Sequence, residues 1–191
     1  MKYMIDMKKL AITILCCLMA IAVQAQVEHL TFMGIPINGS IAQFQSKLQA
    51  KGIRYNAAAS KRLQAGCRTY DGMFSGESAS IYVYYDTKTK KVYRAKAVIT
   101  YNNRERGENE LKNYKEKLVS KYVNGLPKDG QQDGYPSFYL LLPNSKGDCL
   151  GSISLYITNT GYLSIDTVYL HIDYVDGPNS VERDRNNLDD L

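Results

Sequence analysis

Two neighbouring segments near the middle of the chain alternate between apolar and polar side chains. In residues 80–85, Ile81, Val83 and Tyr85 share one face, and residues 92–101 alternate in the same way. A period of two with β-branched and aromatic residues is typical of a half-buried strand. The charged residues 86–91 between the two segments suit a solvated turn. The alternation predicts a β-hairpin with one face on a core and the other, which carries tyrosines and basic residues, towards solvent.

Helical periodicity precedes and follows this hairpin. Residues 41–51 carry apolar side chains at i, i+3 and i+7, and Ser40 with Gln43 matches a capping box. Gly52 is a typical helix end. A second apolar stripe begins after residue 104, with acidic residues near its start, where a helix dipole favours them. The sequence therefore predicts one helix before the hairpin and another after it.

Further strands are expected where short apolar or alternating runs are bounded by turn residues. These runs lie at residues 66–74, 138–142, 150–157 and 163–174, and a bulge near Asp166 would reconcile the two parities of the last run. Asn159-Thr160-Gly161 is expected to be a tight turn. Residues 124–137 are rich in Gly, Pro and Asp and are interpreted as a loop.

The resulting order is helix, three strands, helix, three strands. It predicts an α+β fold made of two tandem α-β-β-β halves, about residues 26–103 and 104–175. Neither half can hide its apolar sheet face alone, so both helices are expected on one face of a continuous antiparallel sheet. Residues 176–191 are charged and are expected to be a frayed tail or a terminal helix.

The N-terminus has the three parts of a secretory signal peptide. Lys8 and Lys9 precede an apolar stretch, and Val23 and Ala25 supply the small residues that a signal peptidase reads. The apolar stretch is shorter than the roughly 20 residues that span a bilayer. We therefore expect residues 1–25 to be removed and the mature protein to be periplasmic or secreted, without an integral membrane segment.

The mature chain is only mildly basic. Without residues 1–25 the formal net charge falls from +5 to +3, and no block of like charges is present. This gives no support to a nucleic-acid role, and export removes routine access to nucleotide cofactors. The chain contains no zinc-protease, mature C-x-x-C or G-x-S-x-G motif. We therefore predict no catalytic residue, metal ligand or cofactor.

Two of the four cysteines, Cys67 and Cys149, remain after removal of the signal. In an oxidising compartment they allow one disulfide. Two separate buried thiols are the alternative, and a chemical role has little support from the widely spaced His29 and His171. Both structural readings stay open from the sequence.

Three segments resemble a family of small exported proteins from Gram-negative anaerobes. They are residues 32–40 (FMGIPINGS), 48–52 (LQAKG) and 188–191 (LDDL). The family has no assigned activity, and these motifs are structural, so the resemblance implies no catalytic residue. The tandem of helix and sheet is also similar in outline to β-lactamase inhibitor proteins, a likeness of topology alone.

Tyrosine is the one unusual feature of the composition, with 16 tyrosines, 4 phenylalanines and no tryptophan. Tyrosine is a good strand residue, but it also offers rigid contact area with a polar tip. Some tyrosines and basic residues share the predicted outer face of the sheet, and these are the candidate binding residues: Tyr82, Tyr84, Arg94, Lys96 and Tyr156. They favour a non-enzymatic module that binds a protein or envelope component; a small cofactor-free hydrolase and a structural envelope protein are the alternatives.

Overall fold

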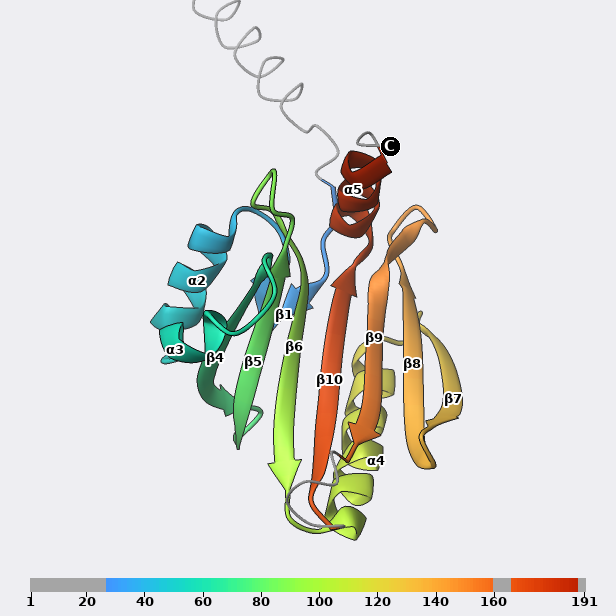
Figure 1. Cartoon of the computed structure of the whole chain (residues 1–191). Coiled ribbons are helices and arrows are strands. Elements are labelled where there is room, and N and C mark those ends of the chain that lie inside the picture. Colours follow the sequence, from blue (N-terminus) through green and yellow to red (C-terminus); the bar gives the residue numbers. More distant parts are fainter. Residues whose placement is uncertain (1–26, 160–165, 189–191) are drawn as a thin grey trace, which may run out of the picture.

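The structure is a computed structural model that describes residues 27–159 and 166–188. Within these ranges the chain has an α+β fold, with an eight-stranded antiparallel sheet, a two-stranded sheet and helices (Figure 1). The strands are β1 (Thr31–Phe32), β2 (Ile35–Pro36), β3 (Arg54–Tyr55), β4 (Cys67–Phe74), β5 (Glu77–Tyr85), β6 (Val92–Tyr101), β7 (Leu126–Gln132), β8 (Tyr135–Pro143), β9 (Cys149–Thr158) and β10 (Val168–Asp176). The helices are α2 (Ile41–Ala50), α3 (Ala57–Ser60), α4 (Arg104–Lys121) and α5 (Gly177–Leu188).

The strand order in the large sheet is β3-β4-β5-β6-β10-β9-β8-β7. The last strands of the two predicted halves, β6 and β10, are therefore neighbours at the centre, and each half runs outwards from them to an edge. The prediction of three strands in each half was too low. β3 adds a short edge strand to one side of the sheet, and β7 adds a longer one to the other.

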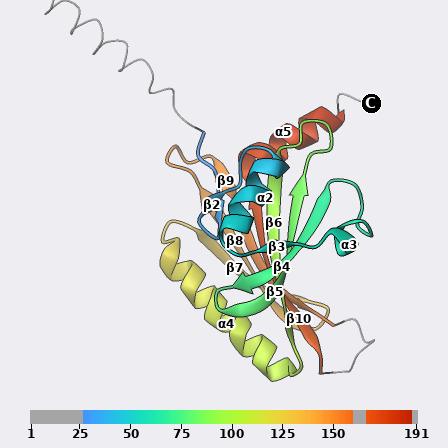
Figure 2. The same ribbon diagram turned by 90° about the vertical axis from the view of Figure 1, so that its left-hand side faces the viewer.

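Helices α2 and α4 cover one face of the sheet, which we call the inner face. Their buried residues are Ile41, Phe44 and Leu48 in α2, and Gly107, Leu111, Tyr114 and Leu118 in α4. These side chains join the inward residues of the strands in one apolar core. Figure 2 shows α4 along one side of the sheet. The predicted capping box is confirmed, since Ser40 N donates to Gln43 Oε1 (2.9 Å) and Gln43 N donates to Ser40 Oγ (3.3 Å).

The prediction of a loop at residues 124–137 was wrong, because this segment contains β7 and the start of β8. Asp133 and Gly134, with φ of 53° and 76°, connect the two strands as a two-residue hairpin turn. Positive φ at both central residues defines the turn type that Asp-Gly favours. β7 pairs with a neighbour on one side only, so Pro127, which lacks an N–H, is tolerated there.

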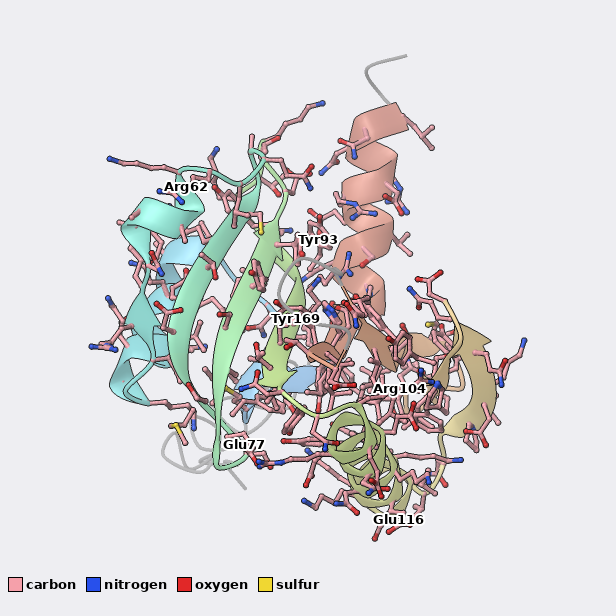
Figure 3. All side chains as sticks on the ribbon, turned by 60° about the horizontal axis from the view of Figure 1, so that its bottom comes forward. Arg62, Glu77, Tyr93, Arg104, Glu116 and Tyr169 are labelled. Atoms are coloured by element: carbon pink, nitrogen blue, oxygen red, sulfur yellow. The ribbon has the colours of Figure 1, made fainter. Side chains whose placement is uncertain are left out.

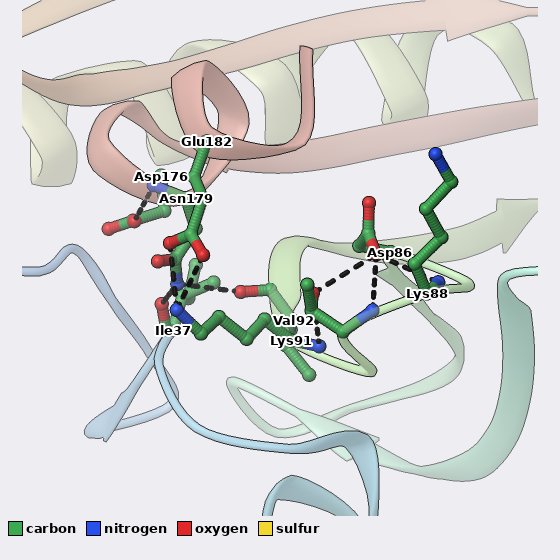
Figure 4. Close-up of polar contacts among 9 residues, drawn as sticks. Ile37, Asp86, Lys88, Lys91, Val92, Asp176, Asn179 and Glu182 are labelled. Atoms are coloured by element: carbon green, nitrogen blue, oxygen red, sulfur yellow. Dashed lines mark hydrogen bonds and ion pairs between the residues drawn. The ribbon is translucent and has the colours of Figure 1, made fainter. Parts of the chain in front are cut away.

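The charged C-terminal segment is a helix rather than a frayed tail. Asp176, which is fully buried, accepts hydrogen bonds from Leu30 N (2.8 Å) and Asn179 N (3.1 Å) and lies 3.0 Å from His29 Nδ1. Asn179 Nδ2 donates to the carbonyl oxygens of Ile37 (2.9 Å) and Val92 (2.8 Å), as Figure 4 shows. These bonds fasten the start of α5 to the N-terminal segment and to β6.

Cys67 and Cys149 are both free, with Cys67 buried and Cys149 exposed. They begin β4 and β9, which three strands separate. At roughly 4.8 Å per strand this is roughly 19 Å, well beyond the roughly 7 Å that a disulfide spans between Cα atoms. The predicted disulfide between Cys67 and Cys149 is therefore not formed in this fold. The sequence left open a disulfide or two separate buried thiols. The structure has two separate thiols, of which only Cys67 is buried.

Three predictions fall partly or wholly on residues outside the described ranges. They are the signal peptide at residues 1–25, the tight turn at 159–161 and the bulge near Asp166. In the part of the chain that the structure describes, no helix combines the length and apolar character needed to cross a bilayer.

Candidate functional site

The five predicted binding residues lie on one face of the large sheet, opposite the inner face. Tyr82 pairs with Lys96 and Tyr84 with Arg94 across β5 and β6. Tyr156 pairs with His171 across β9 and β10, and Lys96 pairs with Asp173 across β6 and β10. Directly paired residues in an antiparallel sheet point to the same side. We call this surface the tyrosine face and define it by Tyr82, Tyr84, Arg94, Lys96, Tyr156, His171 and Asp173.

Six of these seven side chains are partly exposed, and only Asp173 is buried. The alternation in the sequence produces this arrangement. The residues that alternate with the tyrosines and cations along β5 and β6 are each at most 1% exposed: Ile81, Val83, Ala95 and Ala97. The predicted division into a core side and an outer side is thus confirmed for residues 80–84 and 94–101. A register shift between Tyr84 and Tyr85 reverses the parity at the start of β6, so that Val92 is buried in the core and Tyr93, which the alternation placed on the core side, is only partly buried. The tyrosines Tyr82 and Tyr84 are not part of the apolar core.

Arg94 and Asp173 form the strongest polar contact of the face. Arg94 Nε lies 2.8 Å from Asp173 Oδ1, and Arg94 Nη2 donates to Oδ2. This two-pronged geometry raises the pKa of Arg94, with the hydrogen bond to Asp173 as the main cause. The guanidinium carbon also lies 4.7 Å from the ring centroid of Tyr84. Arg94 therefore holds an otherwise isolated buried carboxylate and fixes the Tyr84 ring.

Tyr156 and His171 form a parallel stack on the neighbouring strands. Their ring centroids are 4.5 Å apart and their planes differ by 4°. His171 Nε2 lies 2.9 Å from Thr158 Oγ1, whereas the buried His171 Nδ1 has no hydrogen-bond partner among the described residues. Burial, followed by the nearby charges of Lys96 and Arg94, lowers the pKa of His171 to about 4. His171 is therefore a neutral ring at physiological pH.

Lys96 lies between the two tyrosines of β5. Its Nζ is 5.4 Å from the Tyr82 ring centroid and 5.9 Å from the Tyr84 ring centroid, within cation–π range. Burial lowers the pKa of Lys96, and the charge of Asp173 offsets this in part. Burial also raises the pKa of Tyr82 and of Tyr84, so their phenols stay protonated at neutral pH.

Two hollows open on this surface. One has a volume of about 330 Å³ and is lined by Tyr82, Lys96, Val98, Thr158, Tyr169 and His171. The other, of about 410 Å³, lies over β7, β8 and β9 and includes Tyr156 in its lining. Tyr169, labelled in Figure 3, belongs to β10. The Tyr156–His171 stack thus contributes one ring to each hollow.

Cys67 also lies on this side of the sheet, paired with Tyr84. Burial raises the pKa of its thiol, an effect that the charges of Lys96 and Arg94 only partly offset. A neutral thiol is a weak nucleophile. His171 lies three strands away, at roughly 4.8 Å per strand. The face therefore lacks the close pairing of thiol and base that nucleophilic catalysis uses.

A further hollow, of about 460 Å³, lies at the end of the sheet where α5 begins. Glu28, Ser145, Cys149 and Pro178 are among its lining residues. His29, whose ring is held by Asp176, does not line it. This hollow exposes a thiol without the histidine that would activate it.

The sequence predicted the parity of the face but did not identify two of its defining residues, His171 and Asp173, or the neighbouring Cys67. From the sequence, His171 was considered only for a chemical role with the cysteines, and Asp173 and Cys67 were not placed on the outer face. The pairing of β6 with β10 brings Asp173 to Arg94, and no local pattern encodes this register. Within the described ranges no three His, Cys, Asp or Glu side chains are grouped as a metal site.

Comparison of the chain with protein-family models, with curated proteins and with solved structures yields no match. The resemblance to small exported proteins of Gram-negative anaerobes therefore stays a prediction.

Proposed function

We propose that the protein is an exported, non-enzymatic binding module whose tyrosine face recognises a protein partner. The observation that carries the proposal is the preorganisation of this face. Lys96 and Arg94 hold the rings of Tyr82 and Tyr84, and Asp173 in turn holds Arg94. Partly exposed aromatic and arginine side chains with few free rotamers lose little entropy on association, and such residues dominate binding energy at interfaces.

The chemistry of the face supports binding over catalysis. Its thiol is neutral, its histidine is stacked on Tyr156, and its carboxylate is bound by Arg94. Each of these groups is engaged in holding the surface together. A partner would meet large rings with polar tips, which is the composition typical of interface anchors.

The experiment uses the mature protein, from Gln26 onwards, as bait in an envelope extract. Replacing Tyr82 and Tyr84 together by Ala is expected to weaken the captured partner at least ~10-fold. Tyr55→Ala is the matched control, because Tyr55 is paired with the inner-face residue Tyr70 and also contacts a guanidinium, that of Arg68. The control should keep full affinity.

Circular dichroism and thermal unfolding establish that the double variant is folded. The double variant loses three cation–π contacts, that of Tyr82 with Lys96 and those of Tyr84 with Arg94 and Lys96. At about 0.5–1 kcal/mol each, their loss lowers the melting temperature of a chain this size by roughly 3–12 °C. A folded double variant that binds the partner as tightly as the parent protein would overturn the proposal. If the double variant fails to fold, Tyr156→Ala, on the other side of Lys96, takes its place.

Export is the second part of the proposal and is tested on its own. We expect N-terminal sequencing of the protein recovered outside the cytoplasm to start at Gln26, because Val23 and Ala25 satisfy the cleavage site. Retention of Met1, or a lipid on Cys16 or Cys17, would contradict this part.

A further inference from the structure

We infer that the hollow over Lys96 seats a carboxylate side chain, an Asp or Glu of the partner protein. This inference rests on the proposed binding function and names the chemistry that the partner must present. The hollow is lined by Tyr82, Lys96, Val98, Thr158, Tyr169 and His171. At about 330 Å³ it is at the lower end of the roughly 300–1,000 Å³ usual for ligand pockets.

Lys96 supplies the charge of this hollow and forms no ion pair with a carboxylate of residues 27–159 or 166–188. Among the described residues, none places a carboxylate oxygen within 4 Å of Lys96 Nζ, whose contacts are the ring faces of Tyr82 and Tyr84. Asp173, the direct cross-strand neighbour of Lys96, gives both of its oxygens to Arg94. The charge of Asp173 offsets the desolvation of the Lys96 ammonium only in part. An incoming carboxylate that pairs with this ammonium therefore gains more than it would at an exposed lysine.

The titration of neighbouring groups is consistent with a positive potential in the hollow. The charges of Lys96 and Arg94 add to burial in lowering the pKa of His171. His171 is consequently neutral at pH 7 and presents a flat ring rather than a second cation. The phenols of Tyr82 and Tyr84 are protonated, because burial raises their pKa, and so they do not repel an anion.

The site favours a carboxylate over a phosphate. Arginine recognises a phosphate with its planar fork, which makes two parallel hydrogen bonds, whereas lysine binds an anion only as a point charge. The arginine of this face, Arg94, is already bound in that way to Asp173. What remains for a ligand is a single ammonium flanked by aromatic rings, which matches one negative charge on a short side chain.

The test measures fluorescence anisotropy of labelled hexaglutamate, with hexaglutamine as the uncharged control peptide. Lys96→Met removes the charge and keeps an unbranched apolar stem. Lys117→Met is the matched control, because Lys117 Nζ lies 5.4 Å from the Tyr114 ring on α4 and its loss changes the net charge equally. We expect the parent protein and Lys117→Met to bind hexaglutamate at least ~10-fold more tightly than Lys96→Met. Hexaglutamine should not bind.

Equal binding of hexaglutamate by Lys96→Met and Lys117→Met would overturn the inference, since it would show attraction to the overall positive charge only. The same variants are then used in the capture assay of the proposed function. A partner that is lost from the Tyr82 and Tyr84 double variant but retained by Lys96→Met overturns the carboxylate seat and leaves the binding face intact. A partner retained by all variants overturns both. Loss of hexaglutamate and partner together from Lys96→Met supports the inference.

Discussion

His171 should make the stability of this protein fall as the solution becomes moderately acidic. Its pKa is lowered from 6.5 to about 4 in the folded chain, first by burial and then by the charges of Lys96 and Arg94. Below pH 6.5 the unfolded chain binds a proton that the folded chain does not, so the contribution of the neutral ring is lost as pH falls from 6.5 towards 4. A shift of this size corresponds to roughly 3 kcal/mol in full, of which about 2 kcal/mol is lost between pH 7 and pH 5.

The measurement compares urea unfolding of the parent protein and of His171→Gln at both pH values. Glutamine does not titrate, so the parent should lose about 2 kcal/mol more than the variant. Other titrating groups, including the buried Asp176 at the far end of β10, contribute equally to the pH dependence of both proteins, so their contributions cancel in the difference. The histidine pKa is read directly by NMR, and His29→Gln assigns the two ring signals. A midpoint for His171 near 6.5, or the same pH dependence in both proteins, would refute the reasoning.

Three further outcomes are expected. Leu118→Ala should lower the free energy of unfolding by roughly 2–5 kcal/mol, because Leu118 is 5% exposed, whereas Lys117→Ala should be nearly silent; equal effects in chemical denaturation would contradict the helix phase. Asn179→Ala should cost about 2 kcal/mol or more, because it removes two hydrogen bonds to buried carbonyls, and a stability change near zero would show that α5 is not fastened there. In the mature protein a thiol reagent should modify Cys149 at once and Cys67 only after unfolding, while a native chain with no reactive thiol would disprove the free-cysteine assignment.

Local sequence patterns predicted the elements that are defined by contacts between residues close together in the sequence. The β5–β6 hairpin and helices α2 and α4 carry clear periods, and Ser40 with Gln43 marks the start of α2. β7 was missed because its composition is that of a loop. Every residue of β7 is exposed, so no apolar alternation was required of it. The Asp133-Gly134 pair was the available signal, since it marks the two-residue turn that joins β7 to β8.

The residues of the tyrosine face could be predicted only in part from the sequence, for a different reason. The face of a strand residue follows from parity, which is a property of one segment. The neighbours of that residue depend on which strands pair and in what register. Arg94 meets Asp173 only because β6 pairs with β10, a contact across 79 residues of sequence. Parity therefore identified Arg94 and Lys96, and only the assembled sheet showed that one of them is paired and the other is not.

In the proposed binding function, this inequality between the two cations would set the specificity of the tyrosine face. Had both Arg94 and Lys96 been paired, the face would offer rings and no net charge, and a wide range of apolar partners would fit it equally well. Had neither been paired, two adjacent uncompensated cations would repel each other in a partly desolvated setting. Asp173 neutralises Arg94, and the Arg94 guanidinium lies over the Tyr84 ring and fixes it. Lys96 lines the hollow and forms no ion pair among the described residues. In the proposed complex, a partner without a carboxylate at the matching position would leave that ammonium buried and unpaired. The cost of desolvating Lys96 would then discriminate between partners.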